Sequence, residues 1–396
     1  MINIQRLRVM FGWPKLRAEK SDWKVSWLEL YFDLFFVATI WLIAHTFAHH
    51  LWEIWEWKHF IQLILQVTAV RRLRCSITYF FERFTATWLT KRLFFFLIMF
   101  LVAGMALTIE WWLAEMWMYF FAFYWWAKFL LGTMFLRWRK ELSQELKYID
   151  TLNIVANYIA AIWSLLLFFV PWNWVSFVFV ISLFLDVFIP LLHRRASIKL
   201  PSVGTEKFNE RFGLFVIIVL WEAIIAVITG IDVQAISPEL ISAAAGGLVL
   251  NFGHRWLYFD FINRSEMKKE NIYVRAYLHL PLVIAYTMIW AVLLTLINHL
   301  HDIPNYLMFM LTILAMTVVS LIIVFTYVVG KNINWYEQSS RTRLELLISV
   351  FAMWGLLVLQ PEISVVSHIW ILAWLVFLPI ILRIYARLSL EENILV

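Results

Sequence analysis

Long apolar runs separated by short polar connections form the main pattern of this chain. Each run has roughly the 18–25 residues that a helix needs to cross about 30 Å of hydrocarbon. The runs lie near residues 27–48, 58–81, 91–110, 116–137, 150–170, 173–193, 211–230, 237–258, 273–298, 304–329, 343–360 and 363–388. This pattern predicts an all-α integral membrane protein with about twelve transmembrane helices.

The composition also favours a membrane protein. Hydrophobic residues make up 63% of the chain and charged residues 15%, whereas soluble domains have roughly 45–50% apolar and about 25% charged residues. The basic segment 1–26 has no apolar core that ends in a small-residue cleavage site. We therefore expect this segment to stay in the cytoplasm and the first span to act as its own insertion signal.

The basic residues gather on every second connection. Nearly all of them lie in the N-terminal segment, near 82–92, 137–149, 194–211, 259–275 and 330–343, and at the C-terminus, whereas the opposite connections hold only Lys58. Basic connections face the cytoplasm in multi-span proteins, so both termini are expected there. Topology thus explains the net charge of +6, and no nucleic-acid partner is expected.

Two ordered internal matches indicate a duplication. Segment 187–194 (Val-Phe-Ile-Pro-Leu-Leu-His-Arg) resembles 376–383 (Val-Phe-Leu-Pro-Ile-Ile-Leu-Arg), and 77–80 (Ile-Thr-Tyr-Phe) resembles 256–259 (Trp-Leu-Tyr-Phe). The separations of 189 and 179 residues agree within loop variation. Chance similarity between apolar helices is the alternative. We expect two parallel six-helix halves related by an axis along the membrane normal, at residues 27–204 and 205–396.

Several ionisable residues fall inside the apolar runs, where charge is costly and usually faces protein or water. Glu29 and Asp33 are four residues apart, so they share one face of a helix. Counted at about 1.5 Å per residue, Asp33 and His279 each lie on the order of 9 Å from the cytoplasmic end of their spans. Glu222 comes near the midplane.

Lys128 and Asp186 reach a similar central depth from the outer side. Lys128 placed opposite Asp186 or Glu222 would neutralise charge at the lowest cost. Such a pair has two interpretations. It is either a structural ion pair that locks helices together or part of a solute or proton pathway.

Polar groups near the span ends can also be explained without a role in transport. Glu210 and Arg211 begin a span, where an acidic residue stabilises the helix N-terminus. Pro281 cannot donate its backbone bond to residue 277, so a freed carbonyl beside His279 would form a polar pocket. A lone histidine in a helix is also common as a hydrogen-bonded structural group.

Arg71, Arg72 and Arg74 fall inside the second apolar run. Either this span ends near Val70, with the arginines at the headgroups, or the arginines face a cavity and are paired. We favour the first alternative, because the second requires partners for three charges.

Four motifs follow one another along the chain. They are Trp27-Leu-Glu-Leu-Tyr-Phe-Asp-Leu-Phe-Phe-Val37, Glu210-Arg-Phe-Gly-Leu-Phe-Val-Ile-Ile-Val-Leu-Trp-Glu222, Trp256-Leu-Tyr-Phe-Asp260 and Ala276-Tyr-Leu-His-Leu-Pro-Leu282. In this order they resemble the signatures of the bacterial low temperature requirement A (LtrA) family. The resemblance covers most of the chain and implies a multi-span bacterial plasma-membrane protein. The family's biochemical activity is poorly established, so the resemblance implies no mechanism.

Three positions depart from the family pattern. Trp221 stands where a glycine is usual and would fill space that a glycine leaves open. Lys207 stands where histidine is frequent, and Glu82-Arg-Phe-Thr85 replaces an Asn-Arg-Phe-Asp stretch. The first motif is also similar, more weakly, to the first-helix signature of potassium channels built from six-span repeats, which makes a pore one option.

The sequence lacks the common motifs of nucleotide-binding proteins, hydrolases and metalloproteases. No Walker loop, dinucleotide-binding glycine motif, nucleophile elbow or His-Glu-x-x-His occurs, so ATP-driven pumping is not expected. The connections between the apolar runs are short, so a soluble catalytic domain is not expected either. Cys75 is the only cysteine, which rules out an intramolecular disulfide. Outer histidines such as His45 and His49 have zinc-ligand spacing, but they have no evident third ligand. We expect neither a metal nor a cofactor.

Our first hypothesis is a transporter or channel for a small solute or ion, without enzymatic activity. Its pathway candidates are ionisable residues of the spans and their ends: Glu29, Asp33, Lys128, Asp186, Glu210, Arg211, Glu222, Asp260 and His279. The alternative is an intramembrane enzyme acting on a lipid or isoprenoid substrate, with Glu29, Asp33, Asp260 and His279 as acid–base groups. A non-catalytic membrane scaffold would instead make the charges structural ion pairs. The expected partners are the lipid bilayer and a small solute or ion, and a homodimer stays open.

Overall fold

The computed structural model describes most of the chain. The described residues are 15–16, 27–53, 57–85, 88–109, 117–139, 172–192, 205–231, 236–263, 272–300, 304–329, 336–359 and 363–392, together with single residues and short stretches between 144 and 169.

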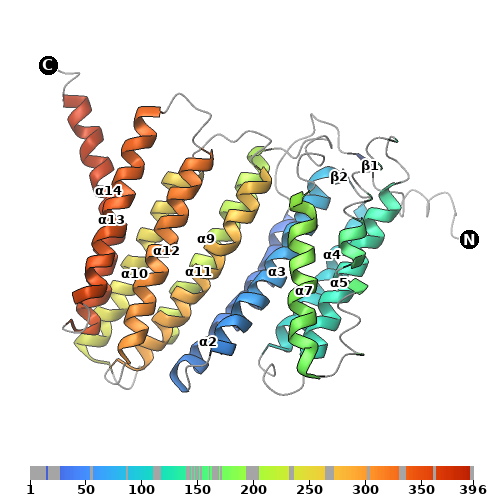
Figure 1. Ribbon diagram of the computed structural model, residues 1–396, viewed down its shortest axis with the longest axis horizontal. Helices are drawn as coiled ribbons and strands as arrows, with labels where there is room; N and C mark the ends of the chain where they lie inside the picture. The colour runs from blue at the N-terminus through green and yellow to red at the C-terminus, as the bar shows by residue number, and fades with distance from the viewer. Residues whose placement is uncertain are drawn as a thin grey trace, which may run out of the picture. The chain divides into compact units, whose positions relative to one another are not determined.

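Helices account for nearly all of the described residues, as Figure 1 shows. In chain order they are α2 (Trp27–Glu53), α3 (Trp57–Arg83), α4 (Trp88–Leu107), α5 (Trp117–Trp138), α7 (Trp172–Leu192), α9 (Thr205–Thr229), α10 (Pro238–Tyr258), the π-helix η2 (Phe259–Asn263), α11 (Ile272–Asn298), α12 (Asn305–Val329), α13 (Tyr336–Leu359) and α14 (Val365–Glu392). Two short strands, β1 (Lys15–Leu16) and β2 (Phe84–Thr85), pair antiparallel. The prediction of a helical protein is confirmed.

Seven of the described helices are long and apolar enough to cross a membrane. Their apolar segments are Trp27–Leu51, Leu89–Leu107, Glu210–Thr229, Val274–Asn298, Asn305–Val328, Ser340–Leu359 and Val365–Tyr385. Each segment coincides with a predicted span. The chain is therefore a multi-pass membrane protein.

The other predicted spans do not meet the same criterion within the described residues. α3, α5, α7 and α10 are helices at the predicted positions, and the run at 150–170 is described only in part. The apolar stretch of α7, Phe177–Leu191, is shorter than in the seven spans. The total of twelve spans stays a prediction.

The second predicted span needs a correction. α3 continues as one helix from Trp57 to Arg83, so the helix does not end near Val70. Arg71 and Arg74 are 1% and 0% exposed, and the side chain of Arg72 is 11% exposed. The arginines are therefore buried inside the protein. Arg72 and Arg74 have acidic partners on other helices, and Arg71 Nη1 donates to Cys75 Sγ at 3.0 Å.

The chain divides into two compact units. Unit 1 comprises Met1–Thr46 and Trp57–Arg211, and unit 2 comprises Phe47–Glu56 and Phe212–Val396. α2 and α9 each contribute residues to both units. The predicted sequence repeat is a separate hypothesis, and it stays a prediction.

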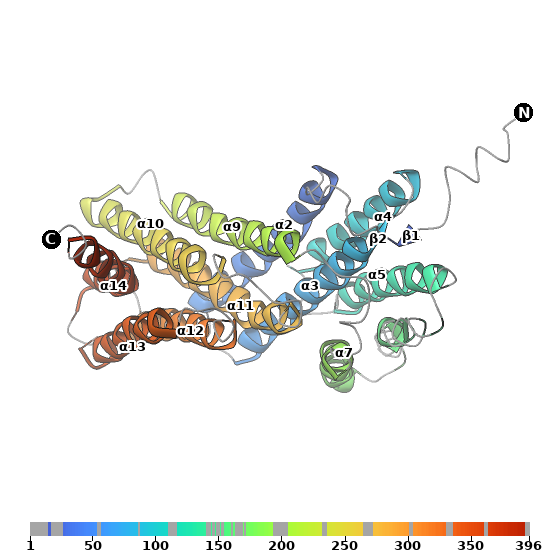
Figure 2. The same ribbon diagram turned by 90° about the horizontal axis from the view of Figure 1, so that it is seen from above.

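Aromatic packing dominates the interior of unit 1. α5 packs against α3 and α4, and α7 packs against α3, an arrangement visible in Figure 2. Phe81 stacks on Phe95 with ring centroids 4.4 Å apart, and Phe32 meets Phe95 edge to face at 4.5 Å. The buried charges of this unit therefore lie in apolar surroundings, where ionic interactions are strong.

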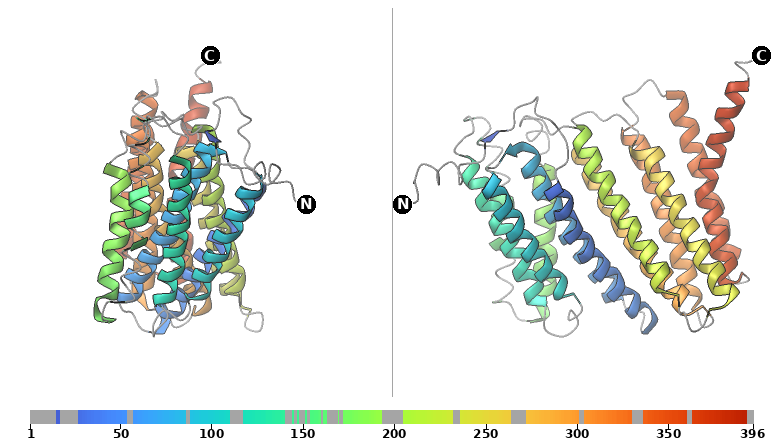
Figure 3. Two further views of the ribbon diagram at one scale, coloured as in Figure 1. Left: turned by 90° about the vertical axis from the view of Figure 1, so that its right-hand side faces the viewer. Right: turned by 180° about the vertical axis from the view of Figure 1, so that it is seen from behind.

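Glycines set the close packing of unit 2. Its helices run side by side in Figure 3, with α10 and α14 among the pairs in contact. A Cβ atom on Gly253 would lie 2.9 Å from Val376 Cγ1, and one on Gly246 would lie 2.9 Å from Ile369 Cγ2. Small residues allow such close approach of membrane helices. α11 is the most buried of the seven apolar segments.

Candidate functional site

Asp33 of α2 is held by two arginines in unit 1. Arg74 of α3 donates from Nε to Oδ1 at 2.9 Å and from Nη2 to Oδ2 at 2.8 Å. Arg211 of α9 places Nη2 3.7 Å from Asp33 Oδ1, and its backbone carbonyl accepts from Arg74 Nη2 at 3.3 Å. All three side chains are at most 1% exposed. The cluster therefore ties together the consecutive helices α2 and α3 and the start of the apolar part of α9.

The geometry of the Asp33–Arg74 pair explains why these charges tolerate burial. A planar guanidinium matches a carboxylate with two parallel hydrogen bonds, which is the strongest form of ion pair in proteins. Arg211 is therefore more than the helix-start residue that the sequence allowed, because its side chain reaches Asp33.

Asp186 of α7 is the partner of Lys128 of α5. Lys128 Nζ lies 2.7 Å from both carboxylate oxygens, and the Tyr124 hydroxyl donates to Oδ2 at 2.8 Å. Lys128, Tyr124 and Asp186 are each at most 1% exposed. Of the two partners that the sequence left open for Lys128, the structure therefore selects Asp186.

Arg72 adds a second basic group at Asp186. Its Nε donates to the Asp186 carbonyl at 3.0 Å and lies 3.6 Å from Oδ2. Lys128 Nζ also donates to Ser76 Oγ at 3.3 Å and to Asn157 Oδ1 at 3.4 Å. α3 thus contacts both buried aspartates, Asp33 through Arg74 and Asp186 through Arg72.

Glu29 pairs with a residue of α4. Lys91 Nζ lies 2.7 Å from Glu29 Oε1. The side chain of Glu29 is 1% exposed and that of Lys91 is 21% exposed, so Glu29 is a buried residue of the unit 1 interior and not only a helix-start carboxylate.

His279 of α11 is fully buried and uses both ring nitrogens. Nδ1 lies 2.7 Å from the Arg275 carbonyl and Nε2 lies 2.8 Å from the Tyr258 hydroxyl. Because a carbonyl only accepts, Nδ1 carries the hydrogen, and in the neutral ring Nε2 accepts from Tyr258. The backbone partner of His279 is thus the Arg275 carbonyl, and the polar pocket expected beside Pro281 stays a prediction.

Glu222 of α9 differs from the other acids inside apolar segments. It is 8% exposed, and it makes no hydrogen bond or ion pair with any described residue. Its neighbour Trp221 points outward, with 56% of its surface exposed. A buried carboxyl without a partner is unusual, because native structures normally hydrogen-bond such groups.

Glu210 and Asp260 are more exposed than the other candidate residues. Glu210 is exposed at the start of the apolar part of α9. Asp260 lies in η2, where Oδ2 accepts from Trp256 Nε1 at 3.1 Å and the backbone carbonyl accepts from Arg383 Nη1 at 3.4 Å.

No group of three or more metal-ligating side chains occurs in the part of the chain that the structure describes. His368, one of the outer histidines, is buried, with Nε2 2.8 Å from Thr312 Oγ1. His45 stacks on Trp41 with ring centroids 5.3 Å apart.

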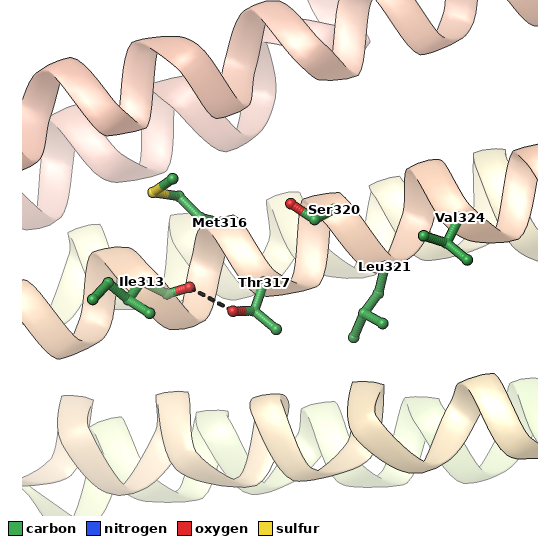
Figure 4. Close-up of a pocket in the computed structure, with 6 residues that line it drawn as sticks. All are labelled: Ile313, Met316, Thr317, Ser320, Leu321 and Val324. Atoms are coloured by element: carbon green, nitrogen blue, oxygen red, sulfur yellow. Dashed lines mark hydrogen bonds between the residues drawn. The ribbon is translucent and has the colours of Figure 1, made fainter.

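Figure 4 shows a pocket of about 340 Å³ along one side of α12. Its lining residues are Ile313, Met316, Thr317, Ser320, Leu321 and Val324. The Thr317 hydroxyl donates to the Ile313 carbonyl at 2.8 Å, and no ionisable side chain lines the pocket. None of the candidate residues contributes to it.

Sequence comparison places most of the chain in one family. The family described as "Bacterial low temperature requirement A protein (LtrA)" matches residues 24–382. Comparisons with curated proteins and with solved structures find no match.

Two interactions link the four family-like motifs in pairs. Within unit 1, Asp33 of the first motif meets Arg211 of the second. Within unit 2, Tyr258 of the third motif is hydrogen-bonded to His279 of the fourth. Trp221, which replaces the usual glycine, is exposed, so it does not fill interior space as we expected. The chain belongs to the bacterial low temperature requirement A (LtrA) family.

Proposed function

We propose that this protein is a transporter or channel of the bacterial plasma membrane that moves a small solute or ion and couples this movement to protons. The proton-carrying group in this proposal is Glu222. The observation that supports it is that the buried acidic residues differ in whether they have a basic partner. Glu29, Asp33 and Asp186 each have a basic partner within hydrogen-bond distance, whereas Glu222 has no polar partner among the described residues.

The absence of a basic partner affects the charge of a buried carboxyl. A carboxyl in low dielectric without a counter-charge favours its neutral form, and intramembrane acids of this kind mark proton relays and ion pathways. Glu222 would take up and release a proton as its surroundings change between water-accessible and closed states. The buried ion pairs of unit 1 would supply the contacts that switch between such states.

We also propose how the chain crosses the membrane. Twelve helices would form two parallel six-helix halves, with both termini in the cytoplasm. This arrangement places Glu222 near the midplane, where a coupling group has access to either side in turn.

Purified protein in liposomes with a trapped pH indicator tests this function. Small carboxylates, amino acids and alkali cations are added one at a time outside, and the internal pH is recorded. A solute that causes proton movement only in protein-containing vesicles supports the proposal. If no solute moves but the vesicle lipids are chemically changed, the intramembrane enzyme is correct. If neither occurs, the scaffold is the better reading.

A further inference from the structure

A stripe of buried side chains on α3 runs between the Asp33 and Asp186 clusters of unit 1. At 3.6 residues per turn, Arg71 lies about 60° around the helix from Arg74 on one side and about 100° from Arg72 on the other. Cys75 and Thr78 follow Arg71 within about two turns on the same side of the helix. Arg71 and Thr78 are each 1% exposed, and Cys75 is 6% exposed. We call Arg71, Cys75 and Thr78 the α3 stripe.

The two clusters beside the α3 stripe hold more positive than negative charge among the described residues. Asp33 and Asp186 are each shared by two basic side chains. The basic pairs are Arg74 with Arg211 and Lys128 with Arg72, respectively. Each carboxylate thus offsets only one of its two positive neighbours. An excess charge in an apolar interior is costly, so this part of unit 1 favours a further negative charge.

Arg71 brings another guanidinium to the same region. Its Nη1 donates to Cys75 Sγ at 3.0 Å. A thiol is only a weak hydrogen-bond acceptor, so this bond does not offset the charge of Arg71. The bond also shows the direction of the side chain, which extends along the helix toward Cys75 and Thr78.

Several polar atoms on this side of α3 make no hydrogen bond with the described residues. They are Arg71 Nε and Nη2, Arg74 Nη1 and Thr78 Oγ1. Arg74 uses the edge formed by its own Nε and Nη2 to hold the Asp33 carboxylate with bonds of 2.9 and 2.8 Å. The same edge of Arg71 can therefore hold a second pair of oxygens, next to a hydroxyl that can also donate. Buried groups of this kind are normally satisfied by bound water or by a bound ion.

The charge of the region favours an anion over water, and the donor geometry favours an oxyanion. A planar guanidinium edge matches two oxygens of a carboxylate or a phosphate with parallel hydrogen bonds. A spherical halide has no such pair of acceptors. The α3 stripe thus combines the charge and the shape that recognise a small oxyanion.

We propose that the α3 stripe, together with Arg74 Nη1, binds a small oxyanion, a carboxylate or a phosphate, in the interior of unit 1. Two oxygens of the anion accept from Arg71 Nε and Nη2, and the Thr78 hydroxyl donates to the same anion. The role of this anion rests on the proposed function, in which it is the solute that moves with protons. Because the stripe is closed to solvent, the anion enters when the transporter changes between its states.

Proton coupling suits an anionic solute. The interior of a bacterial cell is at negative potential, so an anion moves inward against the membrane potential. A proton carried on Glu222 in the same cycle cancels the charge of a monovalent anion. The substrate class and the coupling group therefore belong to one cycle.

Isothermal titration calorimetry of the full chain in lipid nanodiscs tests the site. Sodium acetate, sodium phosphate and sodium chloride are injected separately at constant ionic strength. We expect acetate or phosphate to bind the parent protein, and Arg71→Met to weaken this binding at least tenfold because the two-donor edge is lost. Thr78→Val keeps the shape of the side chain without its hydroxyl and should weaken binding about threefold or more. Arg92→Met is the matched control, since Arg92 is an exposed arginine of α4 in the same unit.

The pattern across the variants decides the result. Binding of acetate or phosphate that Arg71→Met and Thr78→Val weaken and Arg92→Met retains supports the site, and the anion that binds shows whether the ligand is a carboxylate or a phosphate. The site is wrong if neither oxyanion binds, if chloride binds as tightly, or if Arg71→Met binds like the parent. Should Arg71→Met fail to fold, Thr78→Val decides alone.

The titration needs no proton gradient, so its failure differs from failure of the proposed function. If neither oxyanion binds but another class of solute moves protons into liposomes, the anion site is wrong and the proposed function stands. If an oxyanion binds at the α3 stripe but no solute moves protons, the site stands and the proposed function is wrong.

A stability measurement excludes a merely structural role of Arg71. Without added oxyanion, Arg71→Met should unfold at the same temperature as the parent or higher, because methionine fills similar space without an excess buried charge. Adding the oxyanion should raise the melting temperature of the parent and not that of Arg71→Met, since only the parent binds it. A lower melting temperature of Arg71→Met with an equal rise on addition of the oxyanion would show that Arg71 is structural and overturn the site.

Discussion

Arg74 and Asp33 form a two-bond ion pair, 2.9 and 2.8 Å long, between α3 and α2 in the apolar interior of unit 1. Removing one partner leaves the other charge buried, which typically costs about 3–5 kcal/mol, whereas removing both costs far less. We expect Asp33→Leu to lower thermal stability strongly and the double variant Asp33→Leu/Arg74→Met to recover most of the loss. The check is thermal unfolding in detergent.

The double variant also supplies the decisive comparison for this pair. Arg211 stays beside position 33, so recovery should be incomplete. Losses that simply add in the double variant would mean that Asp33 and Arg74 are not coupled.

Tyr124 is the neutral member of the Asp186 cluster. Its hydroxyl bond to the carboxylate is 2.8 Å long, and a hydrogen bond to a charged group contributes about 1.5–3 kcal/mol. Tyr124→Phe should therefore lower stability by that amount. Tyr119→Phe on the same helix is the control, because Tyr119 is 54% exposed. Equal effects of the two substitutions would contradict the assigned contact.

Gly253 and Gly355 offer a matched test of helix packing in unit 2. A Cβ on Gly253 would meet Val376 at 2.9 Å and Phe377 at 3.0 Å, whereas a Cβ on Gly355 meets nothing within 4 Å. Gly253→Ala should destabilise by about 1–3 kcal/mol through overpacking. Gly355→Ala should be neutral or stabilise by roughly 0.5–1 kcal/mol. The reverse order of melting temperatures would exclude the α10–α14 contact.

Cysteine labelling tests the proposed topology. The native Cys75 is 6% exposed and should give little background. With a membrane-impermeant maleimide on intact bacteria, Lys58→Cys should react, and Ser340→Cys should react only after the cells are opened. Labelling of Ser340→Cys in intact cells would contradict cytoplasmic placement of the basic connections.

The helices were predictable because the apolar runs are local in sequence. The seven apolar segments follow directly from runs of Leu, Ile, Val and Phe that need no knowledge of neighbours. The charge partners were not predictable to the same degree. Asp33 and His279 were matched by depth, yet their own partners are Arg74 with Arg211 and Tyr258 with Arg275.

The reason for this difference is physical. Depth along a span follows from residue count, but the side chain that meets a buried charge depends on which helices are neighbours and how each is rotated. Lys128 shows the limit, because the sequence offered Asp186 and Glu222 equally and only packing of α5 against its neighbours selects Asp186. Arg72 and Arg74 were assigned to the headgroups because their acidic partners lie on other helices, α7 and α2.

Glu222 carries the central claim, and one measurement tests it most directly. Proton entry into liposomes, driven by the solute that the screen identifies, is compared for the parent, Glu222→Gln and Glu239→Gln. Glu239 is an exposed acid in the first turn of α10 and serves as the control. The account predicts that Glu222→Gln abolishes solute-dependent proton entry while Glu239→Gln retains it. Proton entry that persists in a folded Glu222→Gln protein would contradict it.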